Sequence, residues 1–162
     1  MNSDPASSNE SARWENDSSK WSQRSISEWV SDKPSTPETD NFNQLLDFAT
    51  EHADVIIPGS GCKPGFACAY DIGDKTIAAW SVRSGEDFKL QIPFGALRIN
   101  LIRDPSIVDF YLDKLHESDG EFSSIEVKGG WPTVSVKDLS SLDITTLKVL
   151  AREISKFSNR NG

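Results

Sequence analysis

Residues 66–94, FACAYDIGDKTIAAWSVRSGEDFKLQIPF, decide the fold of this chain. Three runs in this stretch, at 66–71, 75–82 and 87–94, have the apolar, β-branched and aromatic composition of strands. Short turn segments at 72–74 and 83–86 separate them, and connections of this length join neighbouring antiparallel strands. The sequence therefore predicts an antiparallel β-meander.

The third run shows the clearest alternation of apolar and polar side chains. Phe88, Leu90 and Ile92 alternate with Lys89 and Gln91, which predicts one buried face and one polar face. A proline at position 93 removes a backbone N–H, so this run is expected to end there or to lie at a sheet edge.

Helical patterns lie on both sides of the meander. Apolar residues recur at helical spacing in 40–53, where Asp40 is the expected N-cap, in the segment after Asp104-Pro105 and in 144–157. Further short strands are expected at 55–57, 122–127 and 133–136. The predicted fold class is α+β, with an antiparallel β-meander of three to five strands packed against about three helices.

The first 40 residues have a different composition from the rest of the chain. They contain 11 serines and 8 apolar residues, so burial cannot offset their ordering entropy. We expect a disordered N-terminal tail at 1–24 and a single domain at 25–162. Within 25–31, a short helix is expected to place Ile26, Trp29 and Val30 on the core.

Charge and composition disfavour several classes of function. The net charge is −8, and the chain contains no two adjacent basic residues, which disfavours nucleic acid as a partner. No run of about 18 apolar residues and no apolar leader occurs, so we expect neither membrane insertion nor secretion. Two cysteines are too few for a disulfide framework, which favours the cytoplasm and predicts neither a metal nor another cofactor. No pattern indicates an oligomeric state.

The predicted order of helix, three strands, helix and strand resembles the core of the PD-(D/E)xK nucleases. Asp87-Phe88-Lys89 supplies a D-x-K triplet at the third strand. Such a site needs a second carboxylate, but the meander places Asp71 and Asp74 at the opposite end, roughly 20 Å away. Glu51 and Glu86 do not match the family pattern. A solvated strand face is therefore the favoured interpretation of Asp87 and Lys89.

The glycine-rich segment 59–65 has a weak similarity to a phosphate-binding loop. Lys63 precedes a strand here, whereas in such loops the lysine opens a helix, so a plain turn is favoured. The neighbouring Cys62 could be an activated thiol because Lys63 would lower its pKa. The two histidines, His52 and His116, lie near predicted helix ends, and no base adjoins the thiol in sequence.

The meander topology brings polar residues from three segments to one edge of the sheet. We refer to these residues as the predicted edge site: Cys62, Lys63, Arg83, Ser84, Glu86 and Lys89, with Trp131 as an aromatic wall. Such an edge suits a protein partner, with the Trp-bearing tail as a further contact. The sequence thus predicts a non-enzymatic binding or accessory module. The alternative is a degenerate or unusual metal-dependent nuclease-like domain.

Overall fold

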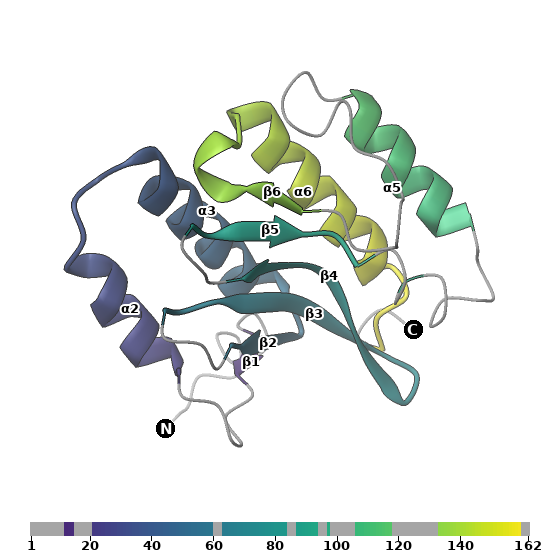
Figure 1. Ribbon diagram of the computed structural model, residues 1–162. Helices are drawn as coiled ribbons and strands as arrows, with labels where there is room; N and C mark the ends of the chain where they lie inside the picture. Colours follow the sequence, from purple (N-terminus) through teal and green to yellow (C-terminus); the bar gives the residue numbers. More distant parts are fainter. Residues whose placement is uncertain are drawn as a thin grey trace.

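A computed structural model of the chain describes residues 12–14, 21–59, 63–83, 87–93, 97, 106–117 and 133–159. Within these ranges the chain forms four α-helices and one six-stranded sheet (Figure 1). The helices are α2 (Gln23–Ser31), α3 (Pro37–His52), α5 (Ser106–Glu117) and α6 (Ser141–Ser155). The strands are β1 (Arg13–Trp14), β2 (Val55–Pro58), β3 (Phe66–Ile72), β4 (Lys75–Arg83), β5 (Lys89–Gln91) and β6 (Thr133–Ser135).

The strands lie in the sheet in the order in which they occur in the chain. Strands β2 to β6 pair antiparallel with their neighbours, as the meander prediction required. Strand β1 pairs parallel with β2, so the sheet is mixed and has six strands. The prediction of a purely antiparallel sheet of three to five strands was wrong on both points. Two helices connect β1 to β2, and a helical crossover of this kind permits parallel pairing.

Strand β1 lies within the range that we expected to be disordered. Its backbone is fixed by two hydrogen bonds, from Ala12 N to Thr50 O at 2.9 Å and from Arg13 N to Asp54 O at 3.0 Å. The Trp14 side chain is half-buried against the core. Composition averaged over 40 residues does not reveal such a short docked segment. The division of the chain at residue 24 remains a prediction.

Helix α2 confirms the short helix expected at 25–31 and begins two residues earlier. The Ser22 side chain accepts a hydrogen bond from Ser25 N and caps the helix. Ile26 and Val30 are buried, and the half-buried Trp29 packs edge-on against Phe88 with ring centroids 5.7 Å apart.

Helix α3 begins earlier than its apolar pattern suggested. Its N-cap is Thr36, whose side chain accepts from Thr39 N at 3.2 Å, and Pro37 occupies the first turn. The expected cap, Asp40, is therefore inside the helix. Proline is compatible with the first turn because the N–H it lacks would have no partner within the helix. The predicted buried stripe is present: Phe42, Leu45, Leu46 and Ala49 are all buried.

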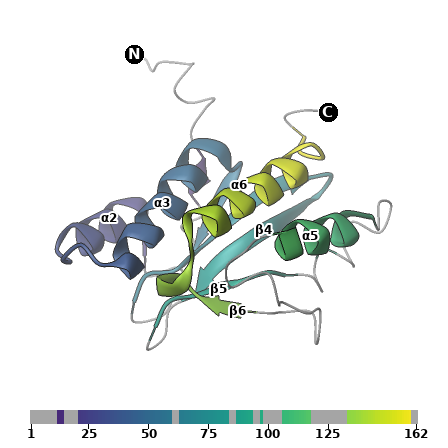
Figure 2. The same ribbon diagram turned by 90° about the horizontal axis from the view of Figure 1, so that it is seen from above.

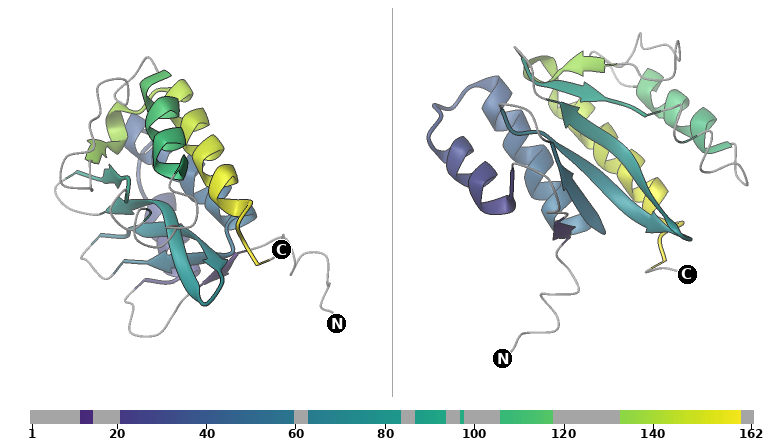
Figure 3. Two further views of the ribbon diagram at one scale, coloured as in Figure 1. Left: turned by 90° about the vertical axis from the view of Figure 1, so that its right-hand side faces the viewer. Right: turned by 60° about the horizontal axis from the view of Figure 1, so that its bottom comes forward.

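The helices form a layer that covers one face of the sheet. Figure 2 shows α2, α3, α6 and α5 side by side in this order, and Figure 3 shows α3 and α6 against the strands. Two buried side chains tie the layers together. Trp80 Nε1 donates to Leu147 O of α6 at 2.9 Å, and the Tyr111 hydroxyl of α5 lies 3.5 Å from Ala79 O of β4 and 3.1 Å from Leu150 O of α6.

An irregularity in β4 determines which side chains face the helices. Cys68 pairs with Trp80 but Ala69 pairs with Ala78, so Ala79 is an extra residue in β4 and forms a β-bulge. Beyond the bulge, Trp80 and Val82 are buried toward the helices. The alternate residue Ser81 therefore points to the other side, which we call the far face of the sheet.

The last part of the described chain follows the predicted order. Strand β6 leads into a 3₁₀ turn (Val136–Asp138), and α6 begins at a Ser140 cap. Asn159 then contacts the turn between β3 and β4: Gly73 N donates to Asn159 Oδ1, and Asn159 Nδ2 donates to Gly73 O, both at 3.0 Å. The predicted strand at 122–127 and the Asp104 cap lie outside the described residues. None of the described helices has the length and hydropathy needed to cross a membrane.

Candidate functional site

The sheet register places two cations of the predicted edge site beside each other. Arg83, at the end of β4, pairs directly with Lys89, at the start of β5. Lys63 is exposed and precedes β3, whose first residue, Phe66, pairs with Val82. The remaining predicted members lie outside the described residues: Cys62, Ser84, Glu86 and Trp131. Their role in a binding site remains a prediction.

The two paired cations differ in their hydrogen bonding. Lys89 Nζ donates to Ser135 Oγ at 2.8 Å, on the side of β6. The exposed Arg83 side chain forms no ion pair or hydrogen bond with the described part of the chain. Like charges directly opposite each other destabilise a sheet. The pair therefore weakens the sheet, and no described carboxylate compensates at Arg83.

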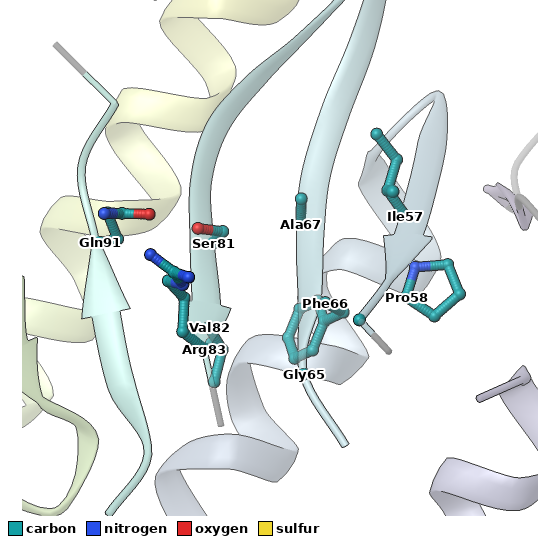
Figure 4. Close-up of a pocket in the computed structure, with 10 residues that line it drawn as sticks. Ile57, Pro58, Gly65, Phe66, Ala67, Ser81, Val82, Arg83 and Gln91 are labelled. Atoms are coloured by element: carbon teal, nitrogen blue, oxygen red, sulfur yellow. The ribbon is translucent and has the colours of Figure 1, made fainter. Parts of the chain in front are cut away.

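A pocket of about 430 Å³ lies next to Arg83 on the far face (Figure 4). We call it the face pocket, and it is lined by Ile57, Pro58, Gly59, Gly65, Phe66, Ala67, Ser81, Val82, Arg83 and Gln91. The register explains how distant segments meet here, because residues 57, 67, 81 and 91 pair one with the next across β2, β3, β4 and β5. They form one row across four strands.

The face pocket has an apolar half and a polar half. Figure 4 shows Ile57 and Ala67 on one side, and Ser81, Arg83 and Gln91 on the other. The Ile57 side chain is 38% exposed, which is unusual in this sheet because most large apolar residues of the strands are buried. No hydrogen bond to another described residue satisfies the side chains of Ser81 and Gln91, as at Arg83.

These groups define the chemistry that the face pocket supports. A guanidinium offers several N–H donors in a planar fork that matches a carboxylate, and the hydroxyl and amide add further donors. The described lining contains neither a histidine nor a carboxylate that could act as a base. The arrangement is thus suited to binding an anionic group beside an apolar one.

Sequence reasoning identified Arg83 but not the other polar members of the face pocket. Alternation counted from Ile77 places Ala79 and Ser81 on the buried side of β4. The bulge at Ala79 reverses this phase and turns Ser81 to the far face. An apolar run such as 77–80 gives no local signal for a bulge, so the pocket could not be predicted.

The D-x-K triplet is engaged in other contacts. Asp87 Oδ2 lies 3.7 Å from Lys137 Nζ, and Lys89 contacts Ser135 as described above. Asp71 lies near the other end of β3, where it pairs with Arg13 at 3.2 Å and accepts from Thr76 Oγ1 at 3.0 Å. In the described ranges no three His, Cys, Asp or Glu side chains are placed to hold a metal ion.

A buried polar cluster lies on the helix side of the sheet. The Tyr70 hydroxyl lies 2.5 Å from His52 Nδ1 and accepts from the Cys68 thiol at 3.8 Å. Burial raises the pKa of Cys68 to about 12 and raises the pKa of Tyr70 far above its ordinary value. Cys68 therefore stays protonated at neutral pH and is a core residue rather than a nucleophile.

Comparison of the chain with protein-family models, with curated proteins and with solved structures finds no match in any of the three.

Proposed function

We propose that this chain is a non-enzymatic binding module that recognises a protein partner through the face pocket. One observation carries the proposal: Ser81, Arg83 and Gln91 point to the far face beside exposed Ile57, and none of the three polar side chains has a hydrogen-bond partner in the described chain. Side chains whose hydrogen-bonding groups are not satisfied within the fold are expected at the places where a protein functions.

The shape of the face pocket favours a protein over a small molecule. Small-molecule sites usually bury most of the ligand surface in a concave cavity. The strand residues that line this pocket span four strands of one sheet, a width of roughly 14 Å at about 4.8 Å per strand spacing. A surface of this width with an exposed apolar residue and an arginine has the composition of a protein interface.

Site-specific photo-crosslinking in source cells tests the proposal. A photoreactive phenylalanine analogue at position 57 should capture a protein, since Ile57 is exposed at the apolar side of the pocket. Arg83→Glu in the same chain should abolish the capture. It should not disturb folding, because it places a carboxylate opposite Lys89.

The matched control is Arg24→Glu on α2. It changes the net charge by the same amount, and the Arg24 side chain is 88% exposed, pairs with Glu28 on α2 and does not line the pocket. The control should capture the same protein as the parent chain. Capture of no protein, or an identical set of captured proteins from all three chains, would contradict the proposal.

We do not advance a nuclease-like domain as a second function, because no described contact favours it. Asp87 is paired with Lys137. The nuclease-like alternative is therefore supported by the D-x-K triplet in the sequence and by no contact among the described residues. A thermal-shift series with Mg²⁺ and Mn²⁺ checks it directly, since an ion that binds only the folded state raises the melting temperature. A metal-dependent rise that Asp87→Asn abolishes would revive this alternative.

A further inference from the structure

We infer that the partner is recognised through an extended segment carrying an Asp or Glu two positions away from an apolar residue. This inference rests on the proposed function and specifies the chemistry of the segment that the face pocket accepts. Its acidic side chain is held by Arg83 with Ser81 and Gln91, and its apolar side chain covers Ala67 and Ile57.

The donor set selects the acidic side chain. Arg83, Ser81 and Gln91 come from adjacent strands, with Ser81 and Gln91 directly opposite each other in the register. Figure 4 shows all three side chains gathered over β4 and β5. Lys89 lies opposite Arg83, so a second positive charge is close by. An arginine with neutral donors and a neighbouring lysine is complementary to a carboxylate.

The sheet geometry sets the spacing between the two recognised side chains. Ala67 lies on β3, and the polar group lies between β4 and β5, which is about 7 Å away at about 4.8 Å per strand. In an extended segment, residues two apart face the same side and are about 6.6 Å apart. A segment that crosses the strands can therefore place its acidic and apolar side chains at once.

Glycines leave room for the backbone of such a segment. Gly59 and Gly65 line the pocket, and Gly59 N donates to Gly65 O at 2.8 Å. A Cβ at Gly59 would lie 3.6 Å from Gly65 O, so a side chain there would fill the space between the two segments. The apolar side of the pocket is thus bounded partly by the backbone of Gly59 and Gly65, beside the side chains of Ile57 and Ala67.

Selection from a library of randomised linear peptides, displayed against the full chain, tests the inference. The expected result is enrichment of sequences with Asp or Glu two positions from a large apolar residue. An individual enriched peptide should bind Arg83→Gln at least about tenfold more weakly, because a charge-assisted hydrogen bond is lost. Its binding to the control, Arg24→Gln, should be unchanged.

A second variant tests the apolar half independently. Ala67→Leu fills the space over β3, so its selected sequences should keep the acidic residue and lose the apolar preference two positions away. Free acetate and inorganic phosphate should not compete at the concentrations that saturate the peptide. Competition by either ion, enrichment without an acidic residue, enrichment indifferent to Arg83, or no enrichment at all would overturn the inference.

The two experiments fail separately. Photo-crosslinking through position 57 depends only on a protein lying over the face pocket, whatever its sequence. If a partner is captured but the peptide selection fails, the inference about the acidic segment is wrong and the proposed binding module stands. If both experiments fail, the proposed function and the inference about the acidic segment are both wrong.

Discussion

Strand β4 presents two faces that differ in how completely their side chains are satisfied. Toward the helices, Trp80 is fully buried and its indole N–H is bonded to Leu147 O, while Val82 is packed beside it. On the far face, Ser81 and Arg83 alternate with these residues and have no described hydrogen-bond partner. Stability is thus concentrated on one side of the strand, and binding capacity is concentrated on the other.

The largest effect should come from the helix side. Trp80→Ala removes a buried indole and leaves a cavity, and should lower the free energy of unfolding by about 3–5 kcal/mol. Ser81→Ala, one residue away on the far face, should change it by no more than about 0.5 kcal/mol. Urea denaturation measures both. Equal losses would mean that the two faces do not differ as described.

Alkaline pH offers a second way to probe the helix side. The pKa of Cys68 is raised from 9.0 to about 12 in the folded chain, so its contribution to stability is complete below pH 9 and is lost as pH rises toward 12. At pH 10 this loss should be on the order of 1 kcal/mol relative to neutral pH. Urea denaturation of Cys68→Ala should show a smaller decline over the same range. Parallel declines in the two proteins would contradict the burial of the thiol.

The third prediction concerns the residue that caps the N-terminus of α3. Thr36→Ala removes the side chain that accepts from Thr39 N and should cost about 1 kcal/mol in unfolding free energy. Asp40→Ala should cost less, because Asp40 lies inside the helix and its carboxylate, within the described chain, accepts only from Ser35 Oγ. If chemical denaturation shows a larger loss for Asp40→Ala than for Thr36→Ala, Asp40 rather than Thr36 is the N-cap.

The smallest effect is expected from an ion pair on the far face. Arg13 and Asp71 lie 3.2 Å apart, and their side chains are 58% and 31% exposed. Solvent weakens such a pair, so Arg13→Ala should cost about 0.2–1 kcal/mol, and less at high salt. A loss comparable to that of Trp80→Ala would show that the far face contributes to stability as much as the helix side does.

Local patterns in the sequence predicted most of the elements but not their exact pairing. The runs that became β3 and β4, and the stripe of Phe42, Leu45 and Leu46 on α3, follow from residue spacing alone. Strand β1 could not be predicted, because two residues carry no periodicity. Thr36 as a cap was missed because Pro37 resembles a linker residue, although it is equally suited to a first helical turn.

The candidate site was predicted only in part, for a related reason. Arg83 and Lys89 are the strand residues on either side of the turn between β4 and β5, so the meander alone brings them together. Ser81 and Gln91 join them through the register beyond the bulge at Ala79, which is set by packing of Trp80 against the helices. Packing between distant segments is not encoded in any short pattern.

The contact between Asn159 and Gly73 has a consequence for the order of biosynthesis. The two residues are separated by 86 positions, and the turn between β3 and β4 is held by both hydrogen bonds of the Asn159 amide. Translation adds about 5–20 residues per second, so the ribosome reaches Asn159 roughly 4–17 s after Gly73. During that interval the hairpin is part of the nascent chain without these two hydrogen bonds, and its tip acquires its contacts with Asn159 only when synthesis has passed α6.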